Sequence, residues 1–330
     1  MLDRRHLLAL PALLPALAPG LALAQGAAPS AWAPSRTGRI IVPFTAGGAT
    51  DATARLIAER LTQSLGQTYV VDNRPGAGGN LGTDMVAKAD PDGHTLLLAT
   101  IGTASINQFL YPRLPFDPLR DFASVGLINQ VTNAIVVHPG VAANNLGELL
   151  ALARQSPGTM NYGTPGNGTS GHMCAEYLKF RTQTRNGHVP YRGTGALMPD
   201  LLGGRIDLAV DNLPAYIPHI REGRLRILAV TSRDRWFAVP EVPTVGQSGV
   251  EGFEAVAWFG MQAPARTPRP ILDRLTSAVG EAVAEPAMQA RFRDLGAEPS
   301  FLDGPAFDRF IAAENDKWRE VVRVAAIKLE

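Results

Sequence analysis

RIIVPFTAGGATDATARLIAERLTQSLG, residues 39–66, contains the pattern that decides the fold class. Residues 39–44 are a short apolar run of the kind found in buried strands. A turn with paired glycines follows, and residues 51–65 then place apolar side chains on one face at helical spacing. Gly66 is positioned to end this helix. A strand joined through a glycine turn to an amphipathic helix predicts the first half of a βαβ unit.

The same alternation of strands and helices continues along the chain, and it predicts α/β layers with parallel strands. The first series continues with a strand at 69–71, a glycine-rich turn at 75–80, a short helix to Ala89 and a strand at 94–99. After an extended stretch at 122–138, the second series has helices at 146–154, 170–180 and 195–202, and strands at 160–162, 188–191, 206–210 and 225–231. An apolar segment at 253–263 leads to three amphipathic helices near 270–284, 287–295 and 305–325.

Residues 1–24 have the parts of a signal peptide. Two arginines precede a proline-interrupted apolar run that ends in Ala22-Leu23-Ala24, the small-x-small pattern read by signal peptidase. The run is too short for a membrane anchor, which needs about 20 apolar residues. The mature chain is therefore expected to begin at Gln25 in the periplasm, after export by the Sec or the twin-arginine route.

Removal of this segment leaves a neutral chain of 306 of the 330 residues. The whole sequence has 31 Lys+Arg and 30 Asp+Glu, and residues 1–24 hold two and one of these, so 29 of each remain. A neutral chain lacks the field that attracts nucleic acid or an anionic membrane. Its length favours two domains. The one cysteine, Cys174, cannot form an intrachain disulfide and is interpreted as a small buried residue.

Two glycine-rich turns between a strand and a helix are candidate anion sites. They are FTAGGATD at 44–51 and GTPGNGTSGH at 163–172, and the second has the GxGxxG spacing of dinucleotide-binding folds. The ribose-binding acid of those folds is missing, because 187–196 holds no Asp or Glu. What remains is a helix N-terminus with the hydroxyls of Thr169 and Ser170, which suits a carboxylate as well as a phosphate. For the first turn, a turn that only needs positive φ explains the glycines equally well.

Seven segments appear in an order that is specific to one family. They are RIIVPFTAGGATD at 39–51, VVDNRPGAGGNLGTDMVAKADPDGHTLLLAT at 70–100, NYGTPGNGTSGHM at 161–173, HVPYRGTGALMPDLLGGRIDLAVDN at 188–212, LRILAVTSRDR at 225–235, EVPTVGQSG at 241–249 and WFGMQAPARTPRPI at 258–271. Together they resemble the Bug (Bordetella uptake gene) family, the substrate-binding receptors of tripartite tricarboxylate transporters. One departure bears on the ligand: Thr45-Ala46 stands where a proline is common before the glycine pair.

This resemblance implies an α/β type II periplasmic binding protein fold, in which two lobes with mixed, mainly parallel sheets are joined by two crossing segments. By matching segments, we place lobe one at 37–134 and 259–330 and lobe two at 135–258, with crossings near 133–139 and 256–261. The implied function is capture of a small organic acid between the lobes by a monomer, without catalysis, for tripartite transporter membrane subunits or a sensor. Dicarboxylates, amino acids and aromatic carboxylates all remain open as ligands, and no cofactor or nucleic acid is expected.

The resemblance also implies the ligand-binding residues. The carboxylate is expected against the first turn, opposite the second turn, with further contacts from the loop at 100–105 and from Asp211. The residues expected to bind are Phe44, Ala46, Gly47, Gly48, Asp51, Thr103, Ser105, Thr164, Gly166, Gly168, Thr169, Ser170, His172 and Asp211. For His172, a role in orienting the second turn is an alternative to ligand contact.

An exported hydrolase or dehydrogenase that uses one glycine turn as its anion site is the alternative function. The nucleophile elbow Gly-x-Ser-x-Gly that would favour it is absent, because Gly168-Thr169-Ser170-Gly171 has the wrong spacing. No histidine pair or Cys/His cluster has metal-ligand spacing, so no metal is predicted. His94 and His138 are interpreted as structural. Aspartates 51, 207 and 211 are interpreted as capping or orienting groups, since no partner for acid–base chemistry is evident.

Overall fold

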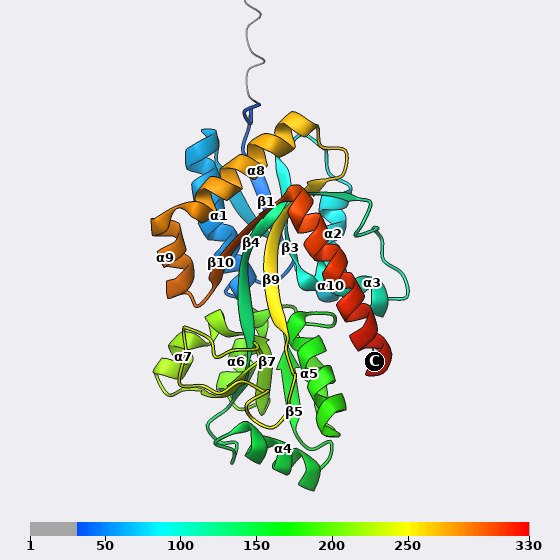
Figure 1. Ribbon diagram of the computed structural model, residues 1–330, viewed down its shortest axis with the longest axis vertical. Helices are drawn as coiled ribbons and strands as arrows, with labels where there is room; N and C mark the ends of the chain where they lie inside the picture. The colour runs from blue at the N-terminus through cyan, green and yellow to red at the C-terminus, as the bar shows by residue number, and fades with distance from the viewer. Residues whose placement is uncertain (1–31, 330) are drawn as a thin grey trace, which may run out of the picture. The chain divides into compact units, whose positions relative to one another are not determined.

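The predicted βαβαβ unit forms the first part of the fold (Figure 1). It consists of β1 (Gly38–Val42), α1 (Ala49–Leu65), β2 (Tyr69–Asn73), α2 (Asn80–Ala87) and β3 (Thr95–Thr100). Strand β1 pairs in parallel with both β2 and β3. Because β2 and β3 flank β1 on opposite sides, right-handed crossovers place α1 and α2 on opposite faces of this sheet.

The structure is a computed structural model that describes residues 32–329. The predicted signal peptide, residues 1–24, and the expected mature N-terminus at Gln25 lie outside the described residues. Within 32–329, no helix combines the length and the apolar composition that a membrane span requires.

Two long strands connect the two sheets of the fold. Strand β4 (Phe122–Val137) pairs with β9 (Val256–Pro264) in the first sheet, and its C-terminal half pairs with β7 (Leu208–Asn212) and β8 (Arg226–Val230) in the second. All of these pairings are antiparallel, as is that of β9 with β3. The extended stretch predicted from the apolar pattern is thus confirmed as β4, and it belongs to both sheets.

The second βα series forms the second sheet. Its strands β5 (Asn161–Thr164), β6 (Gly187–Pro190) and β7 run parallel, with β5 between the other two. Its helices are α4 (Leu146–Gln155), α5 (Ser170–Thr182), α6 (Thr194–Leu202) and the short α7 (Ile217–Arg221). The parallel pairings that the alternating pattern predicted are present in both sheets, and the connecting strands make each sheet mixed.

The last three helices return to the first sheet. They are α8 (Arg269–Ala284), α9 (Pro286–Asp294) and α10 (Gly304–Val324), and β10 (Glu298–Asp303) pairs with β4 between α9 and α10. On α10, Phe307 and Trp318 are fully buried, which confirms the predicted core face. The remaining elements are η1 (Ala77–Gly79), the π-helix η2 (Gly102–Ile106), α3 (Asn107–Leu110) and η3 (Leu213–Ala215).

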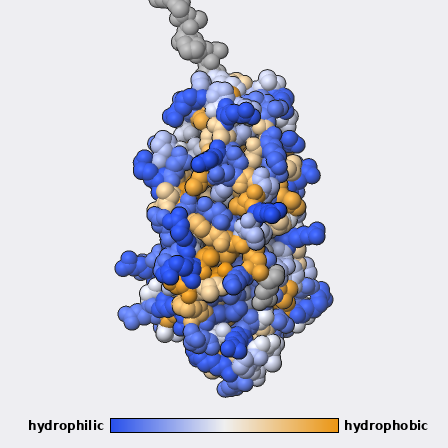
Figure 2. Space-filling model, turned by 90° about the vertical axis from the view of Figure 1, so that its right-hand side faces the viewer, coloured by the Kyte–Doolittle hydropathy of each residue, from blue (hydrophilic) through white to orange (hydrophobic). Residues whose placement is uncertain are grey.

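We use first lobe for the first sheet with α1, α2, α3, α8, α9 and α10, and second lobe for the second sheet with α4 to α7 (Figure 1). Figure 2 shows the side that carries α10 and α5, where apolar residues gather near the middle of the face among hydrophilic ones. Cys174 is fully buried in α5, as predicted.

Candidate ligand-binding site

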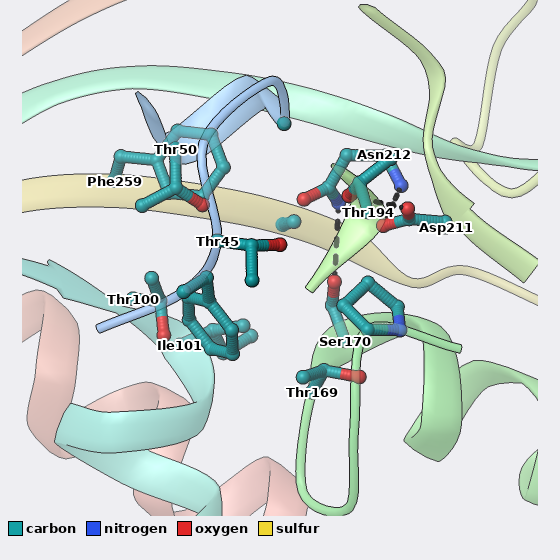
Figure 3. A pocket seen from close by; sticks show the side chains of 14 residues that line it. Thr45, Thr50, Thr100, Ile101, Thr169, Ser170, Thr194, Asp211, Asn212 and Phe259 are labelled. Atoms are coloured by element: carbon teal, nitrogen blue, oxygen red, sulfur yellow. Dashed lines mark hydrogen bonds between the residues drawn. The ribbon is translucent and has the colours of Figure 1, made fainter. Parts of the chain in front are cut away.

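A pocket lies where the two lobes meet, and it contains about 440 Å³ of empty space, part of it open to solvent (Figure 3). Both lobes and the connecting strand β9 contribute to it. The lining residues are Phe44, Thr45, Gly48, Thr50, Thr100, Ile101, Pro165, Thr169, Ser170, Thr194, Asp211, Asn212, Ala257 and Phe259. The strand ends that supply them are the edges at which open α/β sheets bind ligands.

The first turn brings the N-terminus of α1 to the pocket. Gly47 has φ of +91°, a conformation that glycine adopts without strain, and Gly48 caps α1 without any side-chain hydrogen bond. Asp51 is buried and ties this turn together, since its carboxylate accepts from the Gly47 N–H at 3.1 Å and from Asn73 Nδ2 at 3.1 Å. The backbone N–H groups of the first helical turn thereby remain available to a ligand.

The second turn brings the N-terminus of α5 to the opposite wall. Gly168 has φ of +77°, and Thr169 caps the helix by accepting from the His172 N–H at 3.3 Å. His172 lies behind the turn, where its Nδ1 accepts from the Gly168 N–H at 3.2 Å. Burial lowers the pKa of His172 to about 4, so the ring is neutral near pH 7 and can accept this bond.

A third helix, α6, also begins at the pocket. Its first residue, Thr194, lines the pocket, and its N-cap Gly193 makes no side-chain hydrogen bond. The sequence Gly193-Thr194-Gly195 follows β6 in the same way that the two predicted turns follow their strands. This repeated strand–glycine–helix pattern is the signal that could have identified α6 from the sequence.

Glycines let the two lobes approach closely around the pocket. A Cβ on Gly195 of α6 would lie 2.1 Å from the carbonyl oxygen of Ala46 in the first turn. Beside this contact, the Thr45 N–H donates to the Arg192 carbonyl at 3.2 Å. The first turn and the start of α6 therefore meet backbone to backbone.

The helix dipoles set the electrostatic potential of the pocket, because no basic side chain lines it. The N-termini of α1, α5 and α6 all face it, and each carries partial positive charge from its unpaired N–H groups. Asp211 is the only ionisable residue in its lining. Burial raises the pKa of Asp211 to about 6, although hydrogen bonds from Thr194, the Asn212 N–H and Tyr216 lower it. An anion is thus attracted by the helix ends rather than by a charged clamp.

A hydrogen-bond network fixes the second-lobe wall (Figure 3). The Ser170 hydroxyl donates to Asn133 Oδ1 at 3.0 Å, and Asn212 Nδ2 donates to both Asn133 Oδ1 at 2.9 Å and Ser170 Oγ at 3.1 Å. Thr194 Oγ1 donates to Asp211 Oδ2 at 2.7 Å. These bonds connect α5, β7 and α6 to β4, so the polar side chains of the wall hold one another in place.

Five of the fourteen residues expected to bind the ligand line the pocket: Phe44, Gly48, Thr169, Ser170 and Asp211.

The other nine surround the lining without forming it: Ala46, Gly47, Asp51, Thr103, Ser105, Thr164, Gly166, Gly168 and His172. Thr103 and Ser105 are buried in the π-helix behind Thr100 and Ile101, which line the pocket in their place.

Other lining residues were missed by name although their segments were identified. Thr45 and Thr50 belong to the first turn, Pro165 to the second, and Ala257 and Phe259 to the predicted crossing segment. Asn212 follows Asp211 directly. The segments of Thr194, Ala257 and Phe259 were not proposed as part of the site.

The histidines interpreted as structural make local contacts away from the pocket. His94 Nε2 accepts from the Ser35 N–H at 3.2 Å, and His138 Nδ1 accepts from the Gly140 N–H at 3.1 Å. Within residues 32–329, no group of three His, Cys, Asp or Glu side chains could hold a metal ion.

Comparison with known proteins identifies the family. The model of the tripartite tricarboxylate transporter family receptor matches residues 53–327. Protein BugT of Bordetella pertussis is 37% identical over 298 residues, which cover 90% of this chain and 91% of BugT. This chain belongs to the tripartite tricarboxylate transporter receptor family. The resemblance described from the sequence is thereby confirmed.

Solved structures of similar proteins share the fold of this receptor. The structure of R. palustris Rpa4515 with adipate has a TM-score of 0.87 at 37% identity, and the match covers 89% of this chain and 99% of that one. MatC from Rhodopseudomonas palustris with bound malate has a TM-score of 0.83 at 31% identity, covering 88% and 99%. These matches confirm the predicted two-lobe fold, and they support a solute-binding receptor over the alternative of an exported enzyme.

Proposed function

We propose that this receptor captures a small organic acid between its lobes, with one ligand carboxylate held where α1, α5 and α6 begin. The observation that carries the proposal is the convergence of three helix N-termini on a pocket whose lining contains no basic side chain. Backbone N–H groups and helix dipoles bind a carboxylate at such a point. The ligands of two similar proteins, adipate for Rpa4515 and malate for MatC, support a carboxylate as the common feature.

The two-lobe geometry supports capture by closure. We place the lobe boundaries at 37–134 with 259–330 and at 135–258, so that β4 and the start of β9 act as the hinge. Closure presents the α1 N-terminus from one side and those of α5 and α6 from the other. The receptor acts as a monomer, because its lobes must open and close freely, and it catalyses no reaction.

Membership of the family supports the cellular role that we propose. The receptor is exported to the periplasm by its signal peptide and delivers the acid to tripartite transporter membrane subunits or to a sensor. Mass spectrometry of the exported protein is expected to show Gln25 as the first residue. A retained leader would contradict this part of the proposal.

A thermal-shift screen tests the binding role. An acid at 100 times its dissociation constant is expected to add about 2.7 kcal/mol to the free energy of unfolding. The matched control is the amide of the same acid, which keeps the shape and loses the charge. Failure of every dicarboxylate, amino acid and aromatic carboxylate to stabilise the protein, or equal stabilisation by the amide, would contradict the proposal.

A further inference from the structure

The hydroxyl groups of the second-lobe wall already donate their protons to acceptors within the protein. Thr194 donates its proton to Asp211 Oδ2 at 2.7 Å, and Ser170 donates its proton to Asn133 Oδ1 at 3.0 Å. Thr169 donates to the Gly166 carbonyl at 2.8 Å. A hydroxyl has one proton and two acceptor lone pairs, so toward a ligand these three side chains offer acceptors only.

The first-lobe wall has the opposite character. Thr45 Oγ1 is buried and has no hydrogen-bond partner among the described residues, so its proton is free to be donated. Together with the helix N–H groups, this hydroxyl suits the carboxylate of the ligand. Among side chains, the pocket therefore has a donor side in the first lobe and an acceptor side in the second, where the donors are the backbone N–H groups of α5 and α6.

Asp211 strengthens the acceptor side. It is 1% exposed, its partners among residues 32–329 include no cation, and its Oδ1 accepts the Asn212 N–H at 2.6 Å. Oδ2 accepts from Thr194 and from Tyr216 at 3.0 Å. A buried carboxylate without a cation attracts a positive or partly positive ligand group and repels a second anion.

The acceptor side lies next to the carboxylate position. Thr194 supplies both the first N–H of α6 and the hydroxyl oxygen that faces the pocket. A Cβ on Gly48, at the start of α1, would lie 3.0 Å from this oxygen. A hydrogen-bond donor on the carbon beside the ligand carboxylate is therefore close enough to reach Thr194 Oγ1 while the carboxylate contacts the helix ends.

We propose that the ligand is an acid with a hydrogen-bond donor, hydroxyl or ammonium, on its α-carbon, and that Thr194 and Asp211 select for this donor. The inference rests on the proposed function, since it assumes that the pocket holds a carboxylate. Thr194 contacts the donor directly, and Asp211 both directs the Thr194 proton away from the pocket and supplies negative charge.

Calorimetric titration of the purified protein with matched acids tests this selectivity. Each set contains an unsubstituted acid with its α-hydroxy and α-amino counterparts: propionate, lactate and alanine; succinate, malate and aspartate; glutarate, α-hydroxyglutarate and glutamate; phenylacetate, mandelate and phenylglycine. In the set that fits the pocket, a substituted acid is expected to bind about 10- to 150-fold tighter than its parent. Comparison of the α-hydroxy acid with the α-amino acid of each set shows whether the preferred donor is a hydroxyl or an ammonium group.

Variants locate the selectivity. Thr194→Val is expected to lower the affinity for the substituted acid to near the affinity for its unsubstituted parent. The affinity for the parent itself is expected to change little. Thr194→Ser keeps the hydroxyl and is expected to keep the preference. Thr159→Val, an exposed threonine in the same lobe, is the matched control and is expected to stay within about twofold of the native protein.

The outcomes separate this inference from the proposed function. Binding of unsubstituted acids as tightly as their counterparts overturns the donor preference and leaves the receptor role intact. An equal loss for parent and substituted acid in Thr194→Val also overturns it. Binding of no acid in any set contradicts the proposed function and this inference with it.

Discussion

Replacement of Gly195 by alanine is expected to make the protein more stable and a weaker binder at once. Gly195 is the second residue of α6 and does not have a positive φ, so alanine fits the helix. The added Cβ would lie 2.1 Å from the Ala46 carbonyl oxygen of the opposite lobe. Backbone cannot rotate away as a side chain does, so the lobes must separate at this contact.

The structure sets the size of both effects. Overpacking of this kind costs about 1–3 kcal/mol. This cost destabilises only the closed arrangement, in which the two lobes touch. The apparent dissociation constant then rises about 5- to 150-fold, because ligand capture requires that arrangement. In the helix itself, alanine is more favourable than glycine by up to about 1 kcal/mol, so thermal stability without ligand should rise.

Calorimetric titration with the best acid, together with thermal unfolding without ligand, measures the two effects. Gly147→Ala is the matched control, since Gly147 is the second residue of α4 and its added Cβ would meet only Asn145 Oδ1, at 3.3 Å. This control should gain stability and keep its affinity. Native affinity in Gly195→Ala would refute the need for close contact between the first turn and α6.

Three further predictions concern other parts of the molecule. Gly168→Val is expected to abolish binding in titrations, because the new Cβ would lie 1.9 Å from Asn107 Oδ1 and φ is +77°; retained binding would contradict this. The pKa of Asp211 is 3.8 in the unfolded chain and about 6 in the folded protein. The free energy of unfolding should therefore fall by about 3 kcal/mol as the pH rises between these values. Denaturant titrations at several pH values measure this fall, and Asp211→Asn should lack it. Phe307→Ala should destabilise the protein by about 3–5 kcal/mol in the same assay, and a loss below 1 kcal/mol would contradict its role in the core.

Elements with strong periodicity were predictable from the sequence, and weakly patterned ones were not. Helix α1 was predicted within two residues at its start and ends at Gly66 as expected. Strand β10 was missed because EPSFLD has no apolar alternation and its residues are partly exposed. It becomes a strand by pairing with the edge that β4 offers, which is a tertiary effect.

The site was predictable at the level of turns and less so at the level of side chains. Glycine pairs mark where a strand gives way to a helix at a pocket, because the backbone must turn sharply there. Which side chains then point into the pocket depends on how the turn is held. Asp51 faces Gly47 and Asn73, and His172 faces Gly168, so both support their turns from behind.

The absence of a basic side chain from the lining has a consequence for selectivity. A lysine or arginine attracts any anion over about a Debye length, near 10 Å, whether the lobes are open or closed. Helix N–H groups act only within the first helical turn, so α1 from one lobe and α5 and α6 from the other reach the same carboxylate only after closure. An acid that fits one lobe but prevents closure then loses half of its contacts. Selection by shape and by the donor on the α-carbon is therefore stronger than it would be beside a permanent charge.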